Sequence, residues 1–535
     1  MADYDLEKKA THSGDVATGE VVVDENAGHM HRSLKARQVS MIAIAGTIGT
    51  GLFLSSGKAL ANGGPAGALI GYLIVGVLVG LMMYSLGEMM VYDPSAGGFI
   101  EFSSRYIDPA MGFAQGWQFW FQVVISAPTE IVAASIVIEF WDQNANHKAI
   151  YITVMLLAIF LVNLGGVKYF GEFEFVFATL KIVTILGLIL LMLIIDLGGG
   201  PDHDRRGFRY WKREPFNNTF DDLLPQSKAR FPRLLGRVDP GCLFLYGGME
   251  GLAMICLEAS NPQVTIKTAV RAIFYRIVGL YVFSILLIGM CLSRSDPNLL
   301  QANNADTGTA AESPFVIIIQ GAGIKVLPHI INAVILTSAF SSGNEFLYSS
   351  SRSLFMLAQQ GQAPRILAKV LPNGVPIYSL IASTAVACLG YLACAYFSLL
   401  SSLSKPPLPL LIPTTLGSLI TWIGIAGAHI RWYRAMQVQG VSRDVLPFKS
   451  WTQPWGAWTV LISFSIIAFF NGYGTFIGDE FDWRSFISDY INIPAFFILY
   501  FGYKFIKGTK IVPLAEMDVT SHYVENSVVY SKYQE

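Results

Sequence analysis

Gly46-Thr47-Ile48-Gly49-Thr50-Gly51 interrupts an apolar run that extends from Val39 to Leu60. Glycine costs a helix about 1 kcal/mol relative to alanine, so this concentration of glycine predicts a broken helix. Inside a membrane, an unpaired backbone group costs several kcal/mol unless it lines a cavity or binds a polar ligand. The break therefore predicts a polar site within a membrane-spanning segment.

The composition is that of a polytopic membrane protein. Of the 535 residues, 53% are hydrophobic and only 14% are charged, and the mean hydropathy is +0.47. A formal net charge of -1 gives no electrostatic basis for binding nucleic acid. The sequence shows no metal-ligand spacing, phosphate loop or Ser-His-Asp set. We therefore expect neither an enzyme nor a bound metal or cofactor.

Twelve apolar runs predict membrane-spanning helices, because crossing about 30 Å of hydrocarbon takes about 20 residues. These runs are 39–60, 66–90, 113–141, 149–165, 174–196, 241–258, 271–293, 326–349, 376–397, 408–432, 456–476 and 485–506. We therefore expect an all-α polytopic membrane protein with twelve transmembrane helices.

Polar segments flank this membrane domain, which we place at 39–506. Residues 1–38 and 507–535 are charged and poor in apolar clusters, so we expect disordered tails. Lysine and arginine are in excess on the side of the tails once the loop 197–240 is set aside, which predicts that both termini are cytoplasmic. In that loop, Asn217-Asn218-Thr219 matches a glycosylation sequence and favours the outer face.

A second break, Tyr246-Gly247-Gly248-Met249-Glu250-Gly251, falls in the sixth run. Discontinuous helices at matching positions are typical of inverted repeats with a substrate site between them. We therefore expect a five-plus-five repeat with broken helices 1 and 6: repeat one at 39–196, repeat two at 241–432, and two further helices at 456–506. In the alternative interpretation, the glycines are close-packing contacts between helices.

An amino acid fits the two breaks. Its carboxylate would accept hydrogen bonds from the backbone N–H groups of Gly49, Thr50 and Gly51, and its ammonium would meet carbonyl groups freed near Tyr246 and Gly247. Tyr246 is interpreted either as a gate or as a packed aromatic. The predicted substrate-binding residues are Thr47, Ile48, Gly49, Thr50, Gly51, Tyr246, Gly247, Gly248, Glu250 and Glu130.

The sequence resembles the fungal amino-acid permeases of the amino acid–polyamine–organocation superfamily. The resemblance extends over about residues 33 to 510. It is carried by Thr47-Ile48-Gly49-Thr50-Gly51-Leu52-Phe53, Gly87-Glu88-Met89, Ser95-Ala96-Gly97-Gly98-Phe99, Ser341-Ser342-Gly343-Asn344 and Leu446-Pro447-Phe448. It implies a plasma-membrane symporter for amino acids and protons. Met249 and Gly251 beside Glu250, and Glu345 after Asn344, depart from the family pattern near the expected site.

Ionisable residues inside the runs are candidates for coupling, because charges in a membrane are costly. Lys181 lies seven residues into the fifth run. The resemblance implies that protonated Lys181 replaces the ion of sodium-coupled relatives and bridges the fifth helix to the first and eighth; the alternative is snorkelling to the interface. Glu250 is expected to carry a proton or to support the break. Glu130 is expected to line the pocket or to pack as a protonated acid.

Two arguments about the substrate disagree. Leu197-Gly198-Gly199-Gly200-Pro201-Asp202 and Ser313-Pro314-Phe315 resemble the dicarboxylic amino-acid permeases, which implies glutamate and aspartate. An acidic side chain, however, requires a cation or several donors, and Lys181 is expected to be the only lysine or arginine deep in a span. The donors would then be hydroxyl groups such as those of Ser126, Thr129 and Ser341. A general or neutral amino-acid permease is the alternative, and a non-transporting amino-acid sensor is a second one. The oligomeric state is not indicated.

Overall fold

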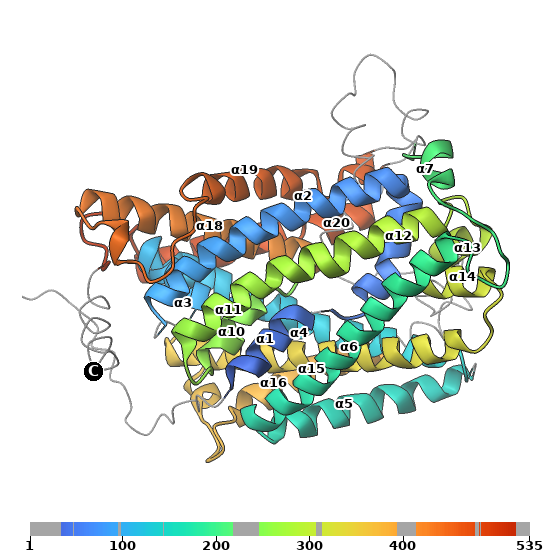
Figure 1. The fold of residues 1–535 in the computed structure, drawn as a ribbon. Helices are drawn as coiled ribbons and strands as arrows, with labels where there is room; N and C mark the ends of the chain where they lie inside the picture. The colour runs from blue at the N-terminus through green and yellow to red at the C-terminus, as the bar shows by residue number, and fades with distance from the viewer. Residues whose placement is uncertain are drawn as a thin grey trace, which may run out of the picture.

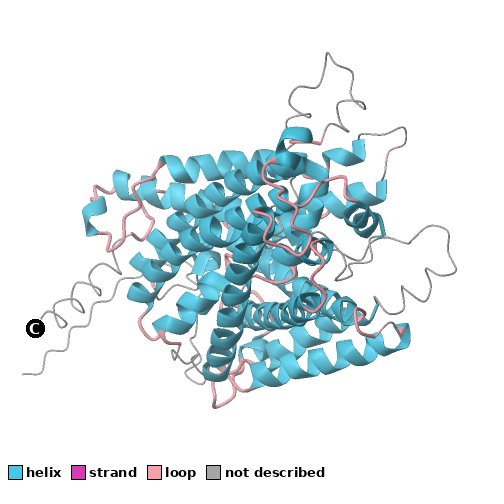
Figure 2. Cartoon of the chain, turned by 45° about the vertical axis from the view of Figure 1, so that its right-hand side comes forward, coloured by secondary structure: helices cyan, strands magenta, loops and turns pink. Residues whose placement is uncertain are grey.

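The computed structural model describes residues 34–45, 48–94, 98–142, 144–217, 246–305, 313–392, 414–476, 481 and 483–519. Within these ranges the chain is built from helices and loops, and no strand occurs among the described residues (Figure 2). The helices are α1 Ala36–Ala45, α2 Ser56–Tyr92, α3 Gly98–Tyr106, α4 Pro109–Ile138, α5 Lys148–Leu164, α6 Val167–Asp196, α7 Arg209–Arg213, α10 Gly251–Leu257, α11 Pro262–Tyr275, α12 Phe283–Cys291, α13 Pro297–Ala305, α14 Pro314–Gly321, α15 Leu327–Gln359, α16 Ile377–Ala387, α18 Thr414–Val438, α19 Trp455–Phe470, α20 Trp483–Tyr490 and α21 Asn492–Lys507.

Three helical stretches of the described chain are long and apolar enough to cross a membrane: Gly51–Tyr92, Pro109–Ile138 and Val167–Asp196. Shorter apolar helices lie at Lys148–Leu164, Gly279–Cys291, Ile377–Gly390 and Trp455–Phe470. Every predicted apolar run overlaps at least one described helix. The prediction of an all-α membrane protein is confirmed at this level, whereas the count of twelve spans and the repeat remain predictions.

The long helices pack side by side in one bundle (Figure 1). α15 packs against α4, and α1 packs against both α6 and α11. α18 contacts α4 and α2, and α19 packs against α18 and α2. The helices thus bring residues 48–50 of the first break into the interior of the bundle, where they contact α4 and α15.

Several helices begin earlier than the apolar runs suggest. α6 begins at Val167 rather than at residue 174, so Lys181 lies near the middle of a 30-residue helix and not seven residues from its end. α11 begins at Pro262, because proline fits the first helical position and the chain enters the helix there. Hydropathy finds the part of a helix that meets lipid or core, and it misses polar turns that extend beyond that part.

Parts of both tails are packed, contrary to the predicted disorder. Met517 and Val519 are 2% and 1% exposed. The amide of Gln439 in α18 donates to the carbonyl groups of Leu514 (2.9 Å) and Met517 (2.7 Å). At the other end of the chain, Leu34 is buried and its N–H donates to the carbonyl of Glu258 at 3.0 Å. The prediction of disorder is therefore wrong for these residues; 1–33 and 520–535 lie outside the described residues.

Gly64 marks a bend inside α2, between the end of the first predicted apolar run and the start of the second. It has a φ of +72°, a backbone conformation that side chains rarely adopt. An added Cβ would also lie 2.8 Å from the carbonyl oxygen of Pro215. Pro215 is held there because its carbonyl accepts the N–H of Ala66 at 2.9 Å. The bend therefore depends on glycine for both conformation and space.

We expect Gly64→Ala to lower the free energy of unfolding by about 1–3 kcal/mol, the usual cost of a strained backbone position. Thermal unfolding of the detergent-solubilised protein measures this loss. Gly187→Ala in α6 is the matched control, since an added Cβ meets nothing within 4 Å there. Equal melting temperatures for the two variants would contradict the role of Gly64.

Candidate functional site

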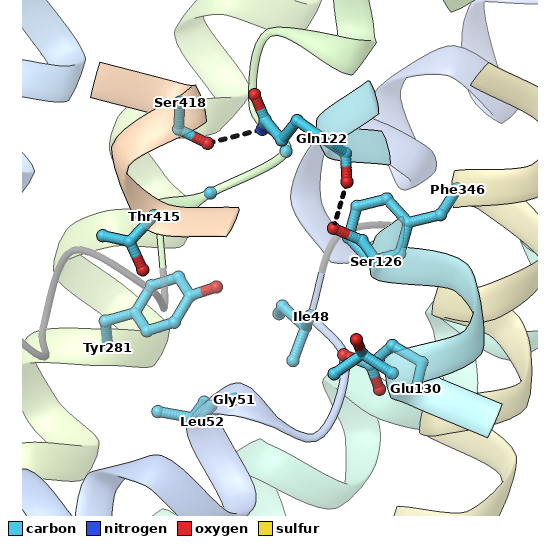
Figure 3. Close-up of a pocket in the computed structure, with 14 residues that line it drawn as sticks. Ile48, Gly51, Leu52, Gln122, Ser126, Glu130, Tyr281, Phe346, Thr415 and Ser418 are labelled. Carbon is cyan, nitrogen blue, oxygen red and sulfur yellow. Dashed lines mark hydrogen bonds between the residues drawn. The ribbon is translucent and has the colours of Figure 1, made fainter. Parts of the chain in front are cut away.

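Both breaks line one cavity in the centre of the bundle. The cavity volume is about 40 Å³, well below the roughly 300–1,000 Å³ typical of small-molecule pockets, so the cavity must widen to admit an amino acid. Ile48, Gly49, Gly51 and Leu52 come from the first break and Gly247 and Gly248 from the second, joined by Gln122, Ser126, Thr129, Glu130, Tyr281, Phe346, Thr415 and Ser418 (Figure 3). The structure thus brings together two segments about 200 residues apart in the chain.

The backbone groups of the first break are bound by side chains. The N–H of Thr50 donates to Glu130 Oε2 at 3.1 Å. Ser338 of α15 donates from its hydroxyl to the carbonyl of Ile48 at 2.8 Å and approaches that of Gly49 at 3.2 Å. A protein carboxylate therefore lies where the sequence predicts the substrate carboxylate. The N–H of Thr50 is thereby bound within the protein, and binding of a substrate carboxylate at Gly49, Thr50 and Gly51 stays a prediction.

The second break forms a tight turn before α10. The N–H groups of Gly251, Leu252 and Ala253 donate to carbonyl groups three residues earlier, at 2.9, 3.2 and 3.0 Å. Gly248 has a φ of 85°. The turn therefore satisfies part of its own backbone and presents Gly247 and Gly248 to the cavity.

Glu250 lies one layer behind the cavity wall. It is fully buried, and its carboxylate accepts hydrogen bonds from Gln122 Nε2 (2.8 Å), Trp422 Nε1 (2.8 Å) and the Ser418 hydroxyl (3.2 Å). Gln122 and Ser418 themselves line the cavity. Of the two predicted roles for Glu250, these contacts support the second, in which it holds the unwound segment and its polar neighbours in place.

Tyr246 is fully buried and is not part of the cavity wall. Its hydroxyl donates to the carbonyl of Tyr72 at 3.1 Å, and its ring packs against Tyr72 and Tyr281 at centroid distances of 6.1 and 5.0 Å. These contacts favour the packed aromatic over the gate. Thr47, also predicted to bind substrate, lies outside the described residues.

Lys181 is fully buried on α6 and interacts electrostatically with Glu174, Glu345 and Glu130. Glu174 precedes it by seven residues, two helical turns, so both lie on one face of α6. The Glu174 carboxylate accepts from the Ser341 hydroxyl (2.6 Å) and from Asn344 Nδ2 (2.8 Å), both in α15. Lys181 therefore belongs to a polar cluster between α6, α4 and α15. Because its side chain is buried among these groups, the alternative interpretation, in which Lys181 extends to the membrane interface, is not supported.

Lys181 is not the only buried cation, contrary to the expectation from the sequence. Arg276 is 2% exposed. It donates to the carbonyl of Ala43 at 3.2 Å and to the Tyr281 hydroxyl at 2.8 Å. With Glu345 it lines a smaller second cavity, beside Ala43 and Leu252. In the sequence, Arg276 lies only five residues after the start of the predicted seventh run, so it was not counted as deep in a span.

Much of the cavity wall was not predicted from the breaks. Gln122, Tyr281, Phe346, Thr415 and Ser418 were missed, and Ser126 and Thr129 were considered only as donors to an acidic side chain. One signal was available: Gln122, Ser126, Thr129 and Glu130 recur at helical spacing and form a polar stripe along the otherwise apolar α4. Such a stripe within a membrane helix indicates a wall facing a polar cavity.

Comparison with known proteins fits this geometry. The model of the amino acid permease family matches residues 38–515. The chain belongs to the amino acid permease family. This permease is 39% identical to the dicarboxylic amino acid permease of Saccharomyces cerevisiae, covering 93% of the chain and 80% of the relative. It is 37% identical to the proline-specific permease of the same yeast (98% and 82% covered) and 35% identical to the lysine-specific permease of Escherichia coli (91% and 96% covered).

The resemblance found in the sequence is thereby confirmed. Membership of the family makes the permease a multi-pass membrane protein for amino-acid transport. The three relatives are named for an acidic, a neutral cyclic and a basic substrate at nearly equal identity. Overall identity therefore does not select the substrate.

We expect Gly49→Ala to abolish most transport without loss of folding. A Cβ at residue 49 would lie 2.2 Å from Glu130 Oε1, so the carboxylate must leave the Thr50 N–H. Losing a hydrogen bond to a charged group costs about 1.5–3 kcal/mol, or at least a tenfold drop in uptake. Radiolabelled amino-acid uptake, normalised to protein at the cell surface, measures this. Gly80→Ala in α2, where an added Cβ meets nothing within 4 Å, should transport normally; normal uptake by Gly49→Ala would show that the break only packs.

Proposed function

We propose that this permease is a secondary active transporter that takes up L-amino acids with protons across the plasma membrane, with acidic amino acids in its range. The observation that carries the proposal is the convergence of both helix breaks on one polar cavity. Backbone groups of the two breaks, together with Glu130, offer complementary sites for a zwitterion. We also propose that the protein has twelve membrane spans, a five-plus-five inverted repeat and cytoplasmic termini.

The cluster around Lys181 supports proton coupling. Three carboxyl groups, those of Glu174, Glu345 and Glu130, interact electrostatically with Lys181, and Arg276 is a second cation that acts on it. Full ionisation would leave one carboxylate without a compensating charge, which is costly in a buried site unless a proton binds. A proton-binding position between α4, α6 and α15 lies next to the first break through Glu130. Rocking of the broken helices against α4 and α15 would then change substrate and proton access together.

Acidic substrates are favoured by the subgroup resemblance and by the yeast dicarboxylic relative. The cavity wall opposes them in part, because Glu130 lines it and no lysine or arginine does among the described residues. A general or neutral amino-acid permease is the alternative, and the proline-specific relative favours it. An amino-acid sensor on the same fold would bind but not accumulate substrate.

A competition assay separates these functions. Expressed in a permease-deficient fungal cell, the protein should accumulate radiolabelled glutamate and aspartate, and excess of either should inhibit uptake of any neutral amino acid that it transports. Untouched neutral uptake, with neither acid transported, would establish the general permease. Binding without accumulation of any of the twenty amino acids would establish the sensor.

Lys181→Gln should abolish accumulation driven by a pH gradient while the protein still reaches the membrane. The substitution removes a buried positive charge facing Glu174, Glu345 and Glu130. Moving one charge inward through a membrane potential of 100 mV releases about 2.3 kcal/mol. Without proton coupling, the variant could not apply this energy to substrate accumulation. Uptake at imposed pH gradients, with Lys168→Gln at the exposed start of α6 as control, measures the coupling. Gradient-driven accumulation at the wild-type level would remove Lys181 from the mechanism.

A further inference from the structure

The Tyr281 hydroxyl stands out among the polar groups of the cavity. Tyr281 lies in a π-helical turn, Arg276–Val282, between α11 and α12. Its ring borders the cavity and its hydroxyl points toward the centre, across from Glu130 (Figure 3). Turns of this kind interrupt α-helices frequently at functional sites. The turn therefore places a hydroxyl group in the cavity from a helix that does not carry either break.

Arg276 lies directly behind this hydroxyl. Arg276 Nη2 donates to Tyr281 Oη at 2.8 Å, and the guanidinium lies over the ring at 5.4 Å from its centroid. The π-helical turn produces this pairing, because it brings residues five apart into register. Both side chains are almost fully buried, at 2% and 1% exposed. Since the tyrosine oxygen accepts from a cation, its own O–H proton is polarised and available to an anion.

The other hydroxyl protons of the cavity wall are mostly committed. Ser126 donates to the carbonyl of Gln122 (2.8 Å), Thr129 to that of Ile125 (3.0 Å), and Ser418 to Glu250 (3.2 Å). Tyr281 is satisfied only as an acceptor within the described part of the chain. Thr415 lies beside it in Figure 3, but no described cation donates to that hydroxyl. Tyr281 is therefore the cavity hydroxyl best suited to donate to an anion.

We propose that the Tyr281 hydroxyl, backed by Arg276, binds the side-chain carboxylate of an acidic substrate. The proposal rests on the proposed function and supplies the cation that an acidic side chain requires and that the cavity wall lacks. A carboxylate at Tyr281 lies across the cavity from Glu130, so the two negative groups are kept apart. Tyr281 acts as the specificity-determining contact and Arg276 as its positioning residue.

Tyr281→Phe tests the contact by removing one oxygen atom and keeping the ring. We expect the KM for glutamate and aspartate to rise about tenfold to a hundredfold, the usual effect of losing a hydrogen bond to a charged group. The KM for a neutral amino acid carried by the same protein should stay within about twofold. Tyr391→Phe is the matched control, because that hydroxyl bonds Thr153 at an exposed site in the scaffold.

Arg276 is tested by two substitutions. In each variant, the KM for glutamate is compared with the KM for the neutral amino acid. Arg276→Gln should raise the KM for glutamate but not for the neutral amino acid, and Arg276→Lys should recover part of the loss because it restores the charge. A merely structural role, through the bond to Ala43, would lower the transport rate for both substrates equally.

Two results would overturn the proposal. An unchanged KM for glutamate in Tyr281→Phe would show that the side chain binds elsewhere. An equal rise for acidic and neutral substrates would show that Tyr281 contacts a group shared by all amino acids. Failure of the proposed function is seen separately, in the unmodified protein: if it transports no acidic amino acid, there is no side-chain carboxylate for Tyr281 to bind.

Discussion

The structure depends on how a membrane protein satisfies backbone groups that are not in a helix. Residues 48–50 leave carbonyl and N–H groups inside the bundle, where water does not compete for them. Ser338 from α15 and Glu130 from α4 bind these groups at 2.8 and 3.1 Å. The first break is thus held from both sides by helices that are themselves continuous. Each of these contacts joins the broken helix to the scaffold around it.

These contacts explain why so much buried polarity lies in one region. Glu130 links the first break to the cluster of Lys181, Glu174 and Glu345. Glu250 links the second break to α4 and α18 through Gln122 and Trp422. Isolated charges at these positions would be strongly unfavourable, but in a connected network each group has a partner of opposite charge or a hydrogen bond. A change of protonation at one member alters the partners of the others.

The cavity combines side chains on continuous helices with three interrupted segments. α4 contributes a polar stripe on a continuous helix, and α18 adds Thr415 and Ser418. The rest of the wall comes from the two breaks and from the π-helical turn with Tyr281. Interrupted helices can change their backbone at lower cost than continuous ones, since fewer helical hydrogen bonds must break. This division fits a family whose members are named for acidic, neutral and basic substrates.

The sequence by itself determined the fold class, the two breaks and the family, because hydropathy and glycine clusters act locally and are visible in the residues. It also identified Lys181, Glu130 and Glu250, since an ionisable residue in an apolar run is conspicuous. Only the tertiary structure decided what these residues contact. It placed Glu130 on the Thr50 N–H, moved Tyr246 out of the cavity wall, and paired Arg276 with Tyr281. Hydropathy does not report which face of a helix meets which neighbour, and that depends on packing between segments hundreds of residues apart.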